Sequence, residues 1–347
     1  MNAPKTFLLF LISTISPALI YAAEPRIPFT IEQVMSAPFA SSPIASPAGG
    51  KVAWLMDERG QRNICIASAP EWKGNKVTSF AQDDGQEIAD LAWAPDGTYL
   101  LFSRGGDFEM GRDNPNPALS PLKPEQAIWV AMMDGSPAKK LTEGHGAAIS
   151  PKGDIIAFLR AGQMFLMKPS GEEAKAVLDE REHPSHLTWS PDGAELAFVS
   201  ARTGHSIIGL YAPADKRLRY VDAGVDKDSE PVWSPDSTRL AYVRIPAQTR
   251  AFDFGPQREG EPWSIRITDV KTGFAREAFR AKKGPGSVFH DVVAEHQIFW
   301  AAGDRLIFPW EQTGWLHLYS LPAQGESATE VTPGEGEVEN VAISADS

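Results

Sequence analysis

The sequence contains a single cysteine and lacks an excess of basic residues. Cys65 has no second thiol with which to form an intramolecular disulfide, so we interpret it as a small buried hydrophobic residue. The chain has 33 lysines and arginines against 45 aspartates and glutamates, a formal net charge of −12. A negative balance argues against nucleic acids and anionic membrane surfaces as partners, because both require a basic contact surface.

The sequence also lacks an unbroken apolar run near its start of the roughly 20 residues that a transmembrane helix requires. The apolar stretch 7–21 is interrupted by three hydroxyl residues and Pro17. It follows one basic residue, Lys5, and ends in two alanines, a pattern typical of a secretory signal peptide. We therefore expect residues 1–23 to be removed on export, leaving 24–347 in the periplasm or outside the cell, without a membrane anchor.

Motifs of familiar active sites are missing as well. A serine hydrolase would show Gly-x-Ser-x-Gly at a sharp turn between a strand and a helix. The nearest approach, 204–209 (Gly-His-Ser-Ile-Ile-Gly), has the wrong spacing, and we interpret it as a loop between two strands. No glycine-rich loop leads from a strand into a helix, so nucleotide binding has no support. We expect no catalytic residues and no cofactor-binding residues in this chain.

Potential metal ligands occur in two short segments, and neither forms a recognisable site. His183 and His186 have no third ligand placed by a helix or a cysteine pair, so we interpret them as part of a turn before the strand at Trp189. The segment 226–230 alternates carboxylates but lacks the glycine and distal glutamate of a calcium loop, which favours a solvated turn. The Pro-rich segment 104–125 predicts a long loop between strands. No metal site is predicted.

What the sequence does contain is a repeat of the Trp-Ser-Pro-Asp-Gly type. In each of five copies, an aliphatic residue lies five positions after the proline and an aromatic residue seven positions after it. The prolines are Pro47, Pro95, Pro151, Pro191 and Pro235, and the pairs are Val52/Trp54, Leu100/Phe102, Ile156/Phe158, Leu196/Phe198 and Leu240/Tyr242. A degenerate copy follows Trp300, with Leu306 and Phe308, and another begins at Ile343.

The physical chemistry of one copy predicts a β-hairpin. Proline presets the backbone for the second position of a type I turn, aspartate suits the third, and glycine closes the turn. The aliphatic and aromatic residues of the following strand are two apart and therefore share one face. Further strand-like segments follow most hairpins: 127–130, 164–167, 207–211, 265–267 and 316–319. Four strands per unit is the content of one propeller blade.

The spacing of the copies supports a β-propeller. Successive prolines are 48, 56, 40 and 44 residues apart, close to the roughly 40–50 residues of a blade. The longer interval after Pro235 predicts an insertion around 249–262. Only 31–36 and 172–182 have helical character, and both are too short for a parallel α/β fold. We predict an all-β propeller of four-stranded antiparallel blades, with a sandwich or another all-β fold as the alternative.

The number of repeat copies indicates whether the propeller domain is complete. About six blades are complete, and the copy that begins at Ile343 stops inside its first turn. We therefore expect the propeller domain, 24–347, to be truncated at its C-terminal end, and its parent to have seven or eight blades.

Ten tryptophans are present, and five of them fall on or beside predicted strands. We interpret these as packing residues rather than as a cage for a ligand. They are Trp93, Trp129, Trp189, Trp233 and Trp263.

Several of these motifs resemble those of a known protein family. Trp-Ser-Pro-Asp-Gly followed by Leu-Ala-Phe resembles the propeller repeat shared by the periplasmic TolB protein and by serine peptidases of the prolyl oligopeptidase (dipeptidyl peptidase IV-like) family. The segment 308–319, which ends Gly-Trp-Leu-His-Leu-Tyr, is similar to a segment late in the propeller of those peptidases. Residues 262–265 and 269–273 are also similar to bacterial members.

The resemblance implies that this chain serves a catalytic domain that it does not itself contain. Such peptidases carry an α/β-hydrolase domain with a Ser/Asp/His triad after the propeller. The propeller covers the active site and restricts entry into it to short peptides. We expect this chain to be the non-catalytic, substrate-gating propeller of an exported serine peptidase, inactive alone. Peptide substrates would then reach it through the missing hydrolase domain. The paired glutamate that binds the substrate amino terminus in dipeptidyl peptidases has no match, because Glu172-Glu173 lacks the surrounding aromatic motif.

Two other functions remain open from the sequence. One is a TolB-like periplasmic module that binds proteins, although TolB-type proteins carry an α/β domain before the propeller. The other is a propeller enzyme with a site of its own, which would require histidines and carboxylates that converge at the centre of the blades. The sequence leaves the oligomeric state and the cleavage preference undetermined.

Overall fold

A computed structural model describes residues 29–106, 121, 124–172, 174–178, 183–247, 259–325 and 327–343. The chain divides into two compact units, Met1–Ala37 and Pro38–Ser347. In the first unit, the short helix α1 (Ile31–Met35) begins at Thr30, whose side chain accepts a hydrogen bond from the backbone N–H of Gln33. This confirms the helix expected at 31–36. The predicted signal peptide lies outside the described residues.

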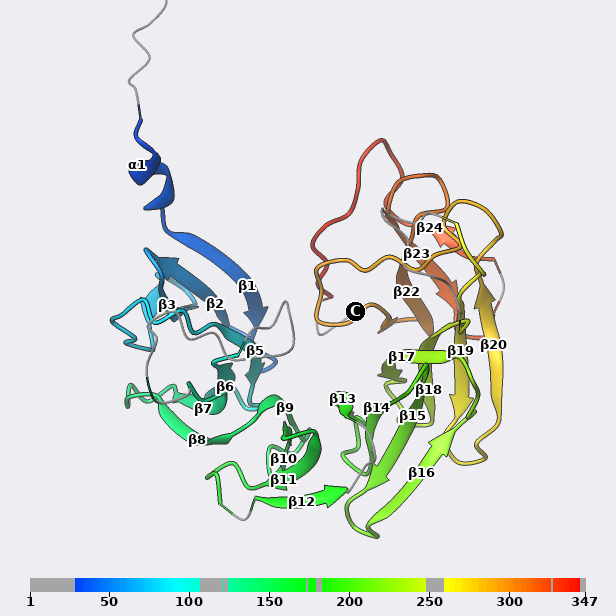
Figure 1. The fold of residues 1–347 in the computed structure, drawn as a ribbon, viewed down its shortest axis with the longest axis horizontal. Coiled ribbons are helices and arrows are strands. Elements are labelled where there is room, and N and C mark those ends of the chain that lie inside the picture. The colour runs from blue at the N-terminus through cyan, green and yellow to red at the C-terminus, as the bar shows by residue number, and fades with distance from the viewer. Residues whose placement is uncertain are drawn as a thin grey trace, which may run out of the picture. The chain divides into compact units, whose positions relative to one another are not determined.

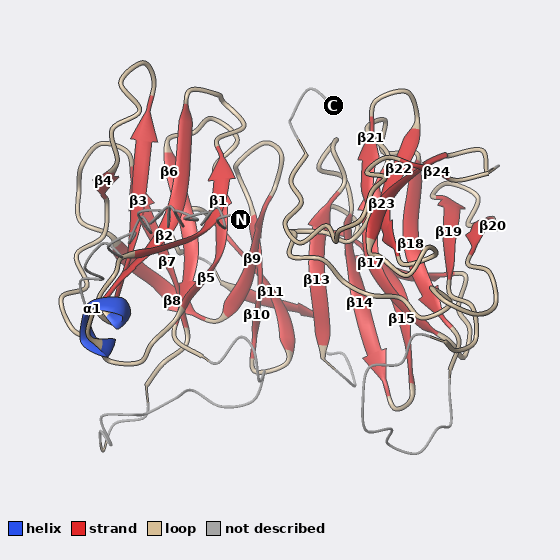
Figure 2. Ribbon diagram, turned by 90° about the horizontal axis from the view of Figure 1, so that it is seen from above, coloured by secondary structure: helices blue, strands red, loops and turns tan. Residues whose placement is uncertain are grey.

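The second unit is built from antiparallel strands (Figure 1; Figure 2). The strands are β1 (Phe39–Ala45), β2 (Lys51–Glu58), β3 (Gln61–Ser68), β4 (Asn75–Lys76), β5 (Ile88–Trp93), β6 (Tyr99–Arg104), β7 (Ala127–Met132), β8 (Lys139–Glu143), β9 (His145–Ile149), β10 (Ile156–Arg160), β11 (Gln163–Met167), β12 (Lys175–Leu178), β13 (Pro184–Trp189), β14 (Leu196–Arg202), β15 (His205–Ala212), β16 (Arg217–Val221), β17 (Lys227–Trp233), β18 (Arg239–Ile245), β19 (Ser264–Asp269), β20 (Ala275–Arg280), β21 (Phe299–Ala301), β22 (Arg305–Trp310), β23 (His317–Pro322) and β24 (Thr329–Glu330). Within the described ranges, no helix is long and apolar enough to cross a membrane.

The strands pair in sequence order, as propeller blades do. Four sheets have four strands each: β1–β4, β5–β8, β9–β12 and β21–β24. The fifth has eight, because β13–β16 and β17–β20 are joined by one parallel bridge between Ser206 and Lys227. This confirms the prediction of an all-β chain with four-stranded antiparallel units. The blade number of a parent protein and the truncation at its C-terminal end stay predictions.

The repeat turns form as their residues require. In all five copies, the backbone N–H at the fourth turn position donates to the carbonyl of the first, at 2.8–2.9 Å. The fourth residue has a left-handed backbone, with φ between 67° and 77° at the four glycines and 61° at Ser237. A left-handed backbone costs an L-residue energy that glycine avoids, which explains why glycine occupies this position in four of the five copies.

The aliphatic and aromatic pairs form the core between sheets. In copies two to five and in the degenerate copy, both members of each pair are fully buried. Each pair packs against the preceding sheet: Leu100 and Phe102, for example, share a cluster with Ala53 and Ile64. Val52 and Trp54, the pair of the first copy, are only half-buried. The shared face predicted from the two-residue spacing is therefore the face by which each sheet contacts its predecessor.

The tryptophans link neighbouring sheets, as expected for packing residues. Trp93, Trp189 and Trp233 are buried in the last position of β5, β13 and β17. Each donates its indole N–H to a backbone carbonyl of the preceding first strand, at 3.1–3.3 Å; the acceptors are Ile44, Ala148 and Thr188. Trp129 lies in β7, and Trp263 directly precedes β19.

The predictions for two polar segments were wrong. The segment 172–182 is not helical where it is described, because Lys175–Leu178 forms β12, which pairs with β11. Residues 226–230 are not a solvated turn, because β17 begins at Lys227 and pairs with β18. Most of the Pro-rich segment 104–125 and of the insertion at 249–262 lies outside the described residues.

Candidate functional site

The first strands of the five units that contain the repeat turn (β1, β5, β9, β13 and β17) each carry a bulge four residues before that turn. There the register of the strand shifts against its partner, and the bulged residue has a left-handed backbone. The five bulge residues are Ser42, Asp90, Gly146, His186 and Glu230, with φ between 51° and 61°. Because four of them are not glycine, they hold a backbone that L-residues avoid, and such strain concentrates at functional sites.

The bulge residues of neighbouring strands lie close together, because β5, β9, β13, β17 and β21 contact one another in that order. Oδ2 of Asp90 accepts hydrogen bonds from the Ser103 hydroxyl (2.6 Å) and from the backbone N–H of Gly146, the next bulge residue (2.8 Å). Asp90 thus joins two sheets through a charged acceptor. The bulges form a row of polar groups in an otherwise apolar repeat.

His186 and Glu230 form the most concentrated part of this row. Nε2 of His186 lies 3.2 Å from Oε1 of Glu230, and the backbone N–H of Gln297 donates to Oε2 over 3.1 Å. The carboxylate is 14 % exposed and the imidazole 52 % exposed. The pair therefore joins three repeat units, while one face of the imidazole stays open to solvent.

The charges at this site shift one another's pKa values. The hydrogen bond to Glu230 raises the pKa of His186, against the opposing effect of burial. Burial favours the neutral form of Glu230, but its interactions with His186 and Gln297 outweigh burial and lower its pKa. Burial, together with the charge of Glu230, raises the pKa of Asp291. These carboxylates and the imidazole are the strongest candidates for polar chemistry at and beside the first strands.

A second group of charges lies deeper in β17 and β18. Asp228 is 1 % exposed and accepts two hydrogen bonds from the Arg244 guanidinium, at 2.7 Å and 2.8 Å. Arg244 also reaches Asp222 at 3.0 Å, and Asp222 accepts a bond from Arg266. Burial raises the pKa of Asp228, an effect that Arg244 opposes. Every charge here has an opposite partner, so this network is structural rather than a binding site.

The residues singled out as metal ligands do not come together. His183 precedes β13, but the prediction that His186 also lies in a turn before the strand was wrong, because His186 is inside β13 and pairs with Glu230. No group of three or more histidine, cysteine or carboxylate side chains that could hold a metal is found in the described part of the chain. Of the Glu172-Glu173 pair, only Glu172 is described.

The serine in the near-miss motif has a structural role. The interpretation of 204–209 as a loop between two strands was wrong, because β15 begins at His205 and contains Ser206. Its hydroxyl donates to the backbone carbonyl of Asp228 over 2.7 Å, which fastens β15 to β17.

The aromatic segment near the end of the repeat region is mostly core. Tyr319 is buried in β23 and stacks on Phe308, with ring centroids 6.3 Å apart. His317 is also buried, and its Nε2 lies 3.5 Å from Glu330. Trp315 is the exception, because it is 43 % exposed in the turn before β23. One aromatic ring of this segment is therefore available for contacts.

The fold of this chain is similar to that of several solved structures. A prolyl endopeptidase matches 90 % of this chain and 45 % of its own, with 14 % identity and a TM-score of 0.61. Dipeptidyl peptidase 4 from Porphyromonas gingivalis matches 89 % of this chain and 49 % of its own, with 13 % identity and a TM-score of 0.59. This chain thus spans about half the length of those peptidases.

Proteins of other activities share the fold. An oligogalacturonate lyase from Vibrio parahaemolyticus matches 81 % of this chain and 76 % of its own, at 13 % identity and a TM-score of 0.57. TolB from Acinetobacter baumannii matches 88 % of this chain and 66 % of its own, with 17 % identity and a TM-score of 0.48. No protein-family model matches the sequence. The chain therefore has the fold that the prolyl endopeptidase and dipeptidyl peptidase 4 structures contain over about half of their length.

Proposed function

We propose that this chain is the substrate-gating propeller of an exported serine peptidase that acts on short peptides. The observation that carries the proposal is the segment Gly314–Tyr319, which is similar to a late propeller segment of these peptidases and leads into β23 of a matching fold. Its exposed Trp315 and buried Tyr319 combine a contact residue with a packing residue. The hydrolase domain would be supplied by sequence outside this chain.

The gating role follows from the placement of the polar row. In a propeller the blades surround a central channel. Asp90, His186 and Glu230, on the first strands β5, β13 and β17, would be the groups that a peptide in the channel meets. A passage of this kind admits an extended chain and excludes a folded protein. The peptidase would then lose its size selectivity, rather than its chemistry, when the propeller is removed.

The decisive experiment is to sequence the gene downstream of this chain and to assay the full-length protein. We expect its reading frame to continue past Ser347 into a domain with Gly-x-Ser-x-Gly, and the full-length protein to hydrolyse chromogenic dipeptides and tripeptides but not folded casein-sized proteins. The present chain alone should be inert in the same assay. A reading frame that stops here would refute the proposal and favour the TolB-like alternative, a periplasmic propeller that acts by binding proteins.

A propeller enzyme with its own site is the second candidate function. The observation in its favour is the convergence of His186 and Glu230 at 3.2 Å, with the charge of Asp291 close enough to contribute to the raised pKa of His186. An imidazole held by a carboxylate is an arrangement suited to general acid–base catalysis. Turnover of any substrate by this chain alone, abolished by His186→Ala and retained by His205→Ala, would select this candidate over gating.

A further inference from the structure

A cavity between β20 and the following sheet stands apart from the polar row. It has a volume of about 320 Å³, at the lower end of the roughly 300–1,000 Å³ typical of small-molecule sites. β20 is the last strand of its sheet, and Ala278 is an extra residue between the two register pairs that Phe279 and Glu277 make with β19. This bulge bends the edge strand locally, which leaves room beside the next sheet.

The floor of the cavity is apolar and rigid. Phe279 and Trp310 are buried and meet edge to face, with ring centroids 4.9 Å apart. The indole N–H of Trp310 is already donated to the backbone carbonyl of Gly286 over 2.8 Å. Ala278 and Ala328 also line the space. A ligand therefore finds a hydrocarbon surface there and no free donor on the tryptophan.

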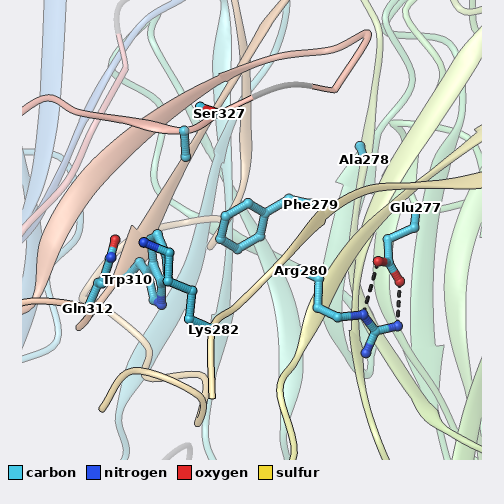
Figure 3. Close-up of a pocket in the computed structure, with 9 residues that line it drawn as sticks. Glu277, Ala278, Phe279, Arg280, Lys282, Trp310, Gln312 and Ser327 are labelled. Atoms are coloured by element: carbon cyan, nitrogen blue, oxygen red, sulfur yellow. Dashed lines mark hydrogen bonds and ion pairs between the residues drawn. The ribbon is translucent and has the colours of Figure 1, made fainter. Parts of the chain in front are cut away.

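The rim of the cavity carries an uncompensated positive charge. Arg280 is neutralised by a two-fold interaction with Glu277, at 3.0 Å and 2.5 Å, drawn as dashed lines in Figure 3. Lys282 lies on the opposite side of the view, near Trp310 and Gln312. Among the described residues, no carboxylate forms an ion pair with Lys282. The side-chain amide of Gln312 and the hydroxyl of Ser327 add neutral polar groups to the lining.

We propose that this cavity binds a small monocarboxylate with a flat apolar body. The carboxylate would accept hydrogen bonds from Lys282 and Gln312, and the apolar body would cover Phe279 and Trp310. An amine of the same shape would be repelled by Lys282, and a neutral molecule would lose the charge-assisted hydrogen bond, which is about twice as strong as a neutral one. The site is independent of peptidase gating, so either proposal can fail alone.

The test uses 4-fluorophenylacetate as the probe and ¹⁹F NMR line broadening of the probe as the readout. We expect the full chain to bind the probe, and Lys282→Ala to weaken this binding about tenfold. The amine 4-fluorophenethylamine should bind the full chain no more tightly than the probe binds Lys282→Ala. Lys283→Ala is the matched control, because it removes the same charge from the neighbouring exposed residue outside the lining, and it should bind like the unmodified chain.

A second variant tests the space itself. Ser327→Trp places a bulky ring into the cavity from an exposed position, so it should abolish binding while the thermal unfolding midpoint stays unchanged. Absence of binding to the unmodified chain overturns the proposal. Equal binding by the unmodified chain and Lys282→Ala, or undiminished binding by a folded Ser327→Trp, does so as well.

Discussion

Trp233 donates its indole N–H to the backbone carbonyl of Thr188, a residue of the preceding first strand, over 3.1 Å. The same bond recurs between Trp189 and Ala148. In each case the tryptophan directly precedes its turn, and the acceptor lies two residues before the preceding turn. The repeat therefore encodes a contact between consecutive sheets as well as a hairpin within each sheet.

Trp233→Phe should lower the free energy of unfolding by about 1–3 kcal/mol, because the carbonyl of Thr188 loses its donor and the smaller ring packs less well. The measurement is the midpoint of urea unfolding, with the slope used to check that the transition is unchanged. Trp72→Phe is the control: Trp72 is 53 % exposed, so its replacement should cost less than about 0.5 kcal/mol. Equal midpoints for the two variants would show that the bond is energetically unimportant.

The turn glycines should be sensitive to any side chain. Gly193 has φ 72°, and a Cβ there would meet only Pro151, at an ordinary contact distance of 3.6 Å. The cost of Gly193→Ala is therefore conformational, about 1–2 kcal/mol. Gly336→Ala, at a site with open space and no positive φ, should leave thermal unfolding unchanged or raise its midpoint slightly. A neutral Gly193→Ala would mean that this turn relaxes without cost.

The sequence was sufficient for the fold because the repeat combines turn chemistry with a two-residue spacing. Leu196 and Phe198 were predicted to share a face, and both are fully buried on it. The candidate site was harder to foresee. His186 and Glu230 are 44 positions apart, and only the contact of β13 with β17 brings them together. The available signal was their common position four residues before a turn, although a bulge there is visible only in the strand register.

Burial was the other quantity that the sequence did not reveal. The alternating charges of 226–230 have the composition of a solvated turn, yet the strand places Asp228 inside and Glu230 at a bulge. The deciding partner, Arg244, lies in the next strand and neutralises Asp228. A hydrophilic segment can therefore form a first strand when the neighbouring strand supplies the opposite charge.

Asp228→Ala should be among the most damaging substitutions in the chain. It leaves Arg244, whose side chain is only 13 % exposed, without its main partner, and breaking a buried pair costs about 3–5 kcal/mol. The control is Glu277→Ala, which breaks the exposed pair with Arg280 and should cost less than about 1 kcal/mol. Urea unfolding of both variants gives the comparison, and a similar loss for both would contradict a special role for burial.

The His186–Glu230 pair should make stability depend on pH. The pKa of His186 is raised from 6.5, so its contribution is fully present below about pH 6.5 and is lost as the pH rises through the higher folded value. The pKa of Glu230 is lowered from 4.5, so its contribution is present above about pH 4.5 and is lost as the pH falls through the lower folded value. The pair therefore stabilises the fold most between these two limits.

His186→Gln tests this window because glutamine cannot be charged. The loss of unfolding free energy relative to the unmodified chain should be larger at about pH 5.5 than at about pH 8.5. Its size should stay below about 1 kcal/mol, because the imidazole is half exposed and solvent screens the pair. His205→Gln is the control, because it makes the same replacement at a histidine that forms no ion pair with a carboxylate among the described residues. A loss for His186→Gln that grows with pH instead would mean that the pair is not an ion pair in solution.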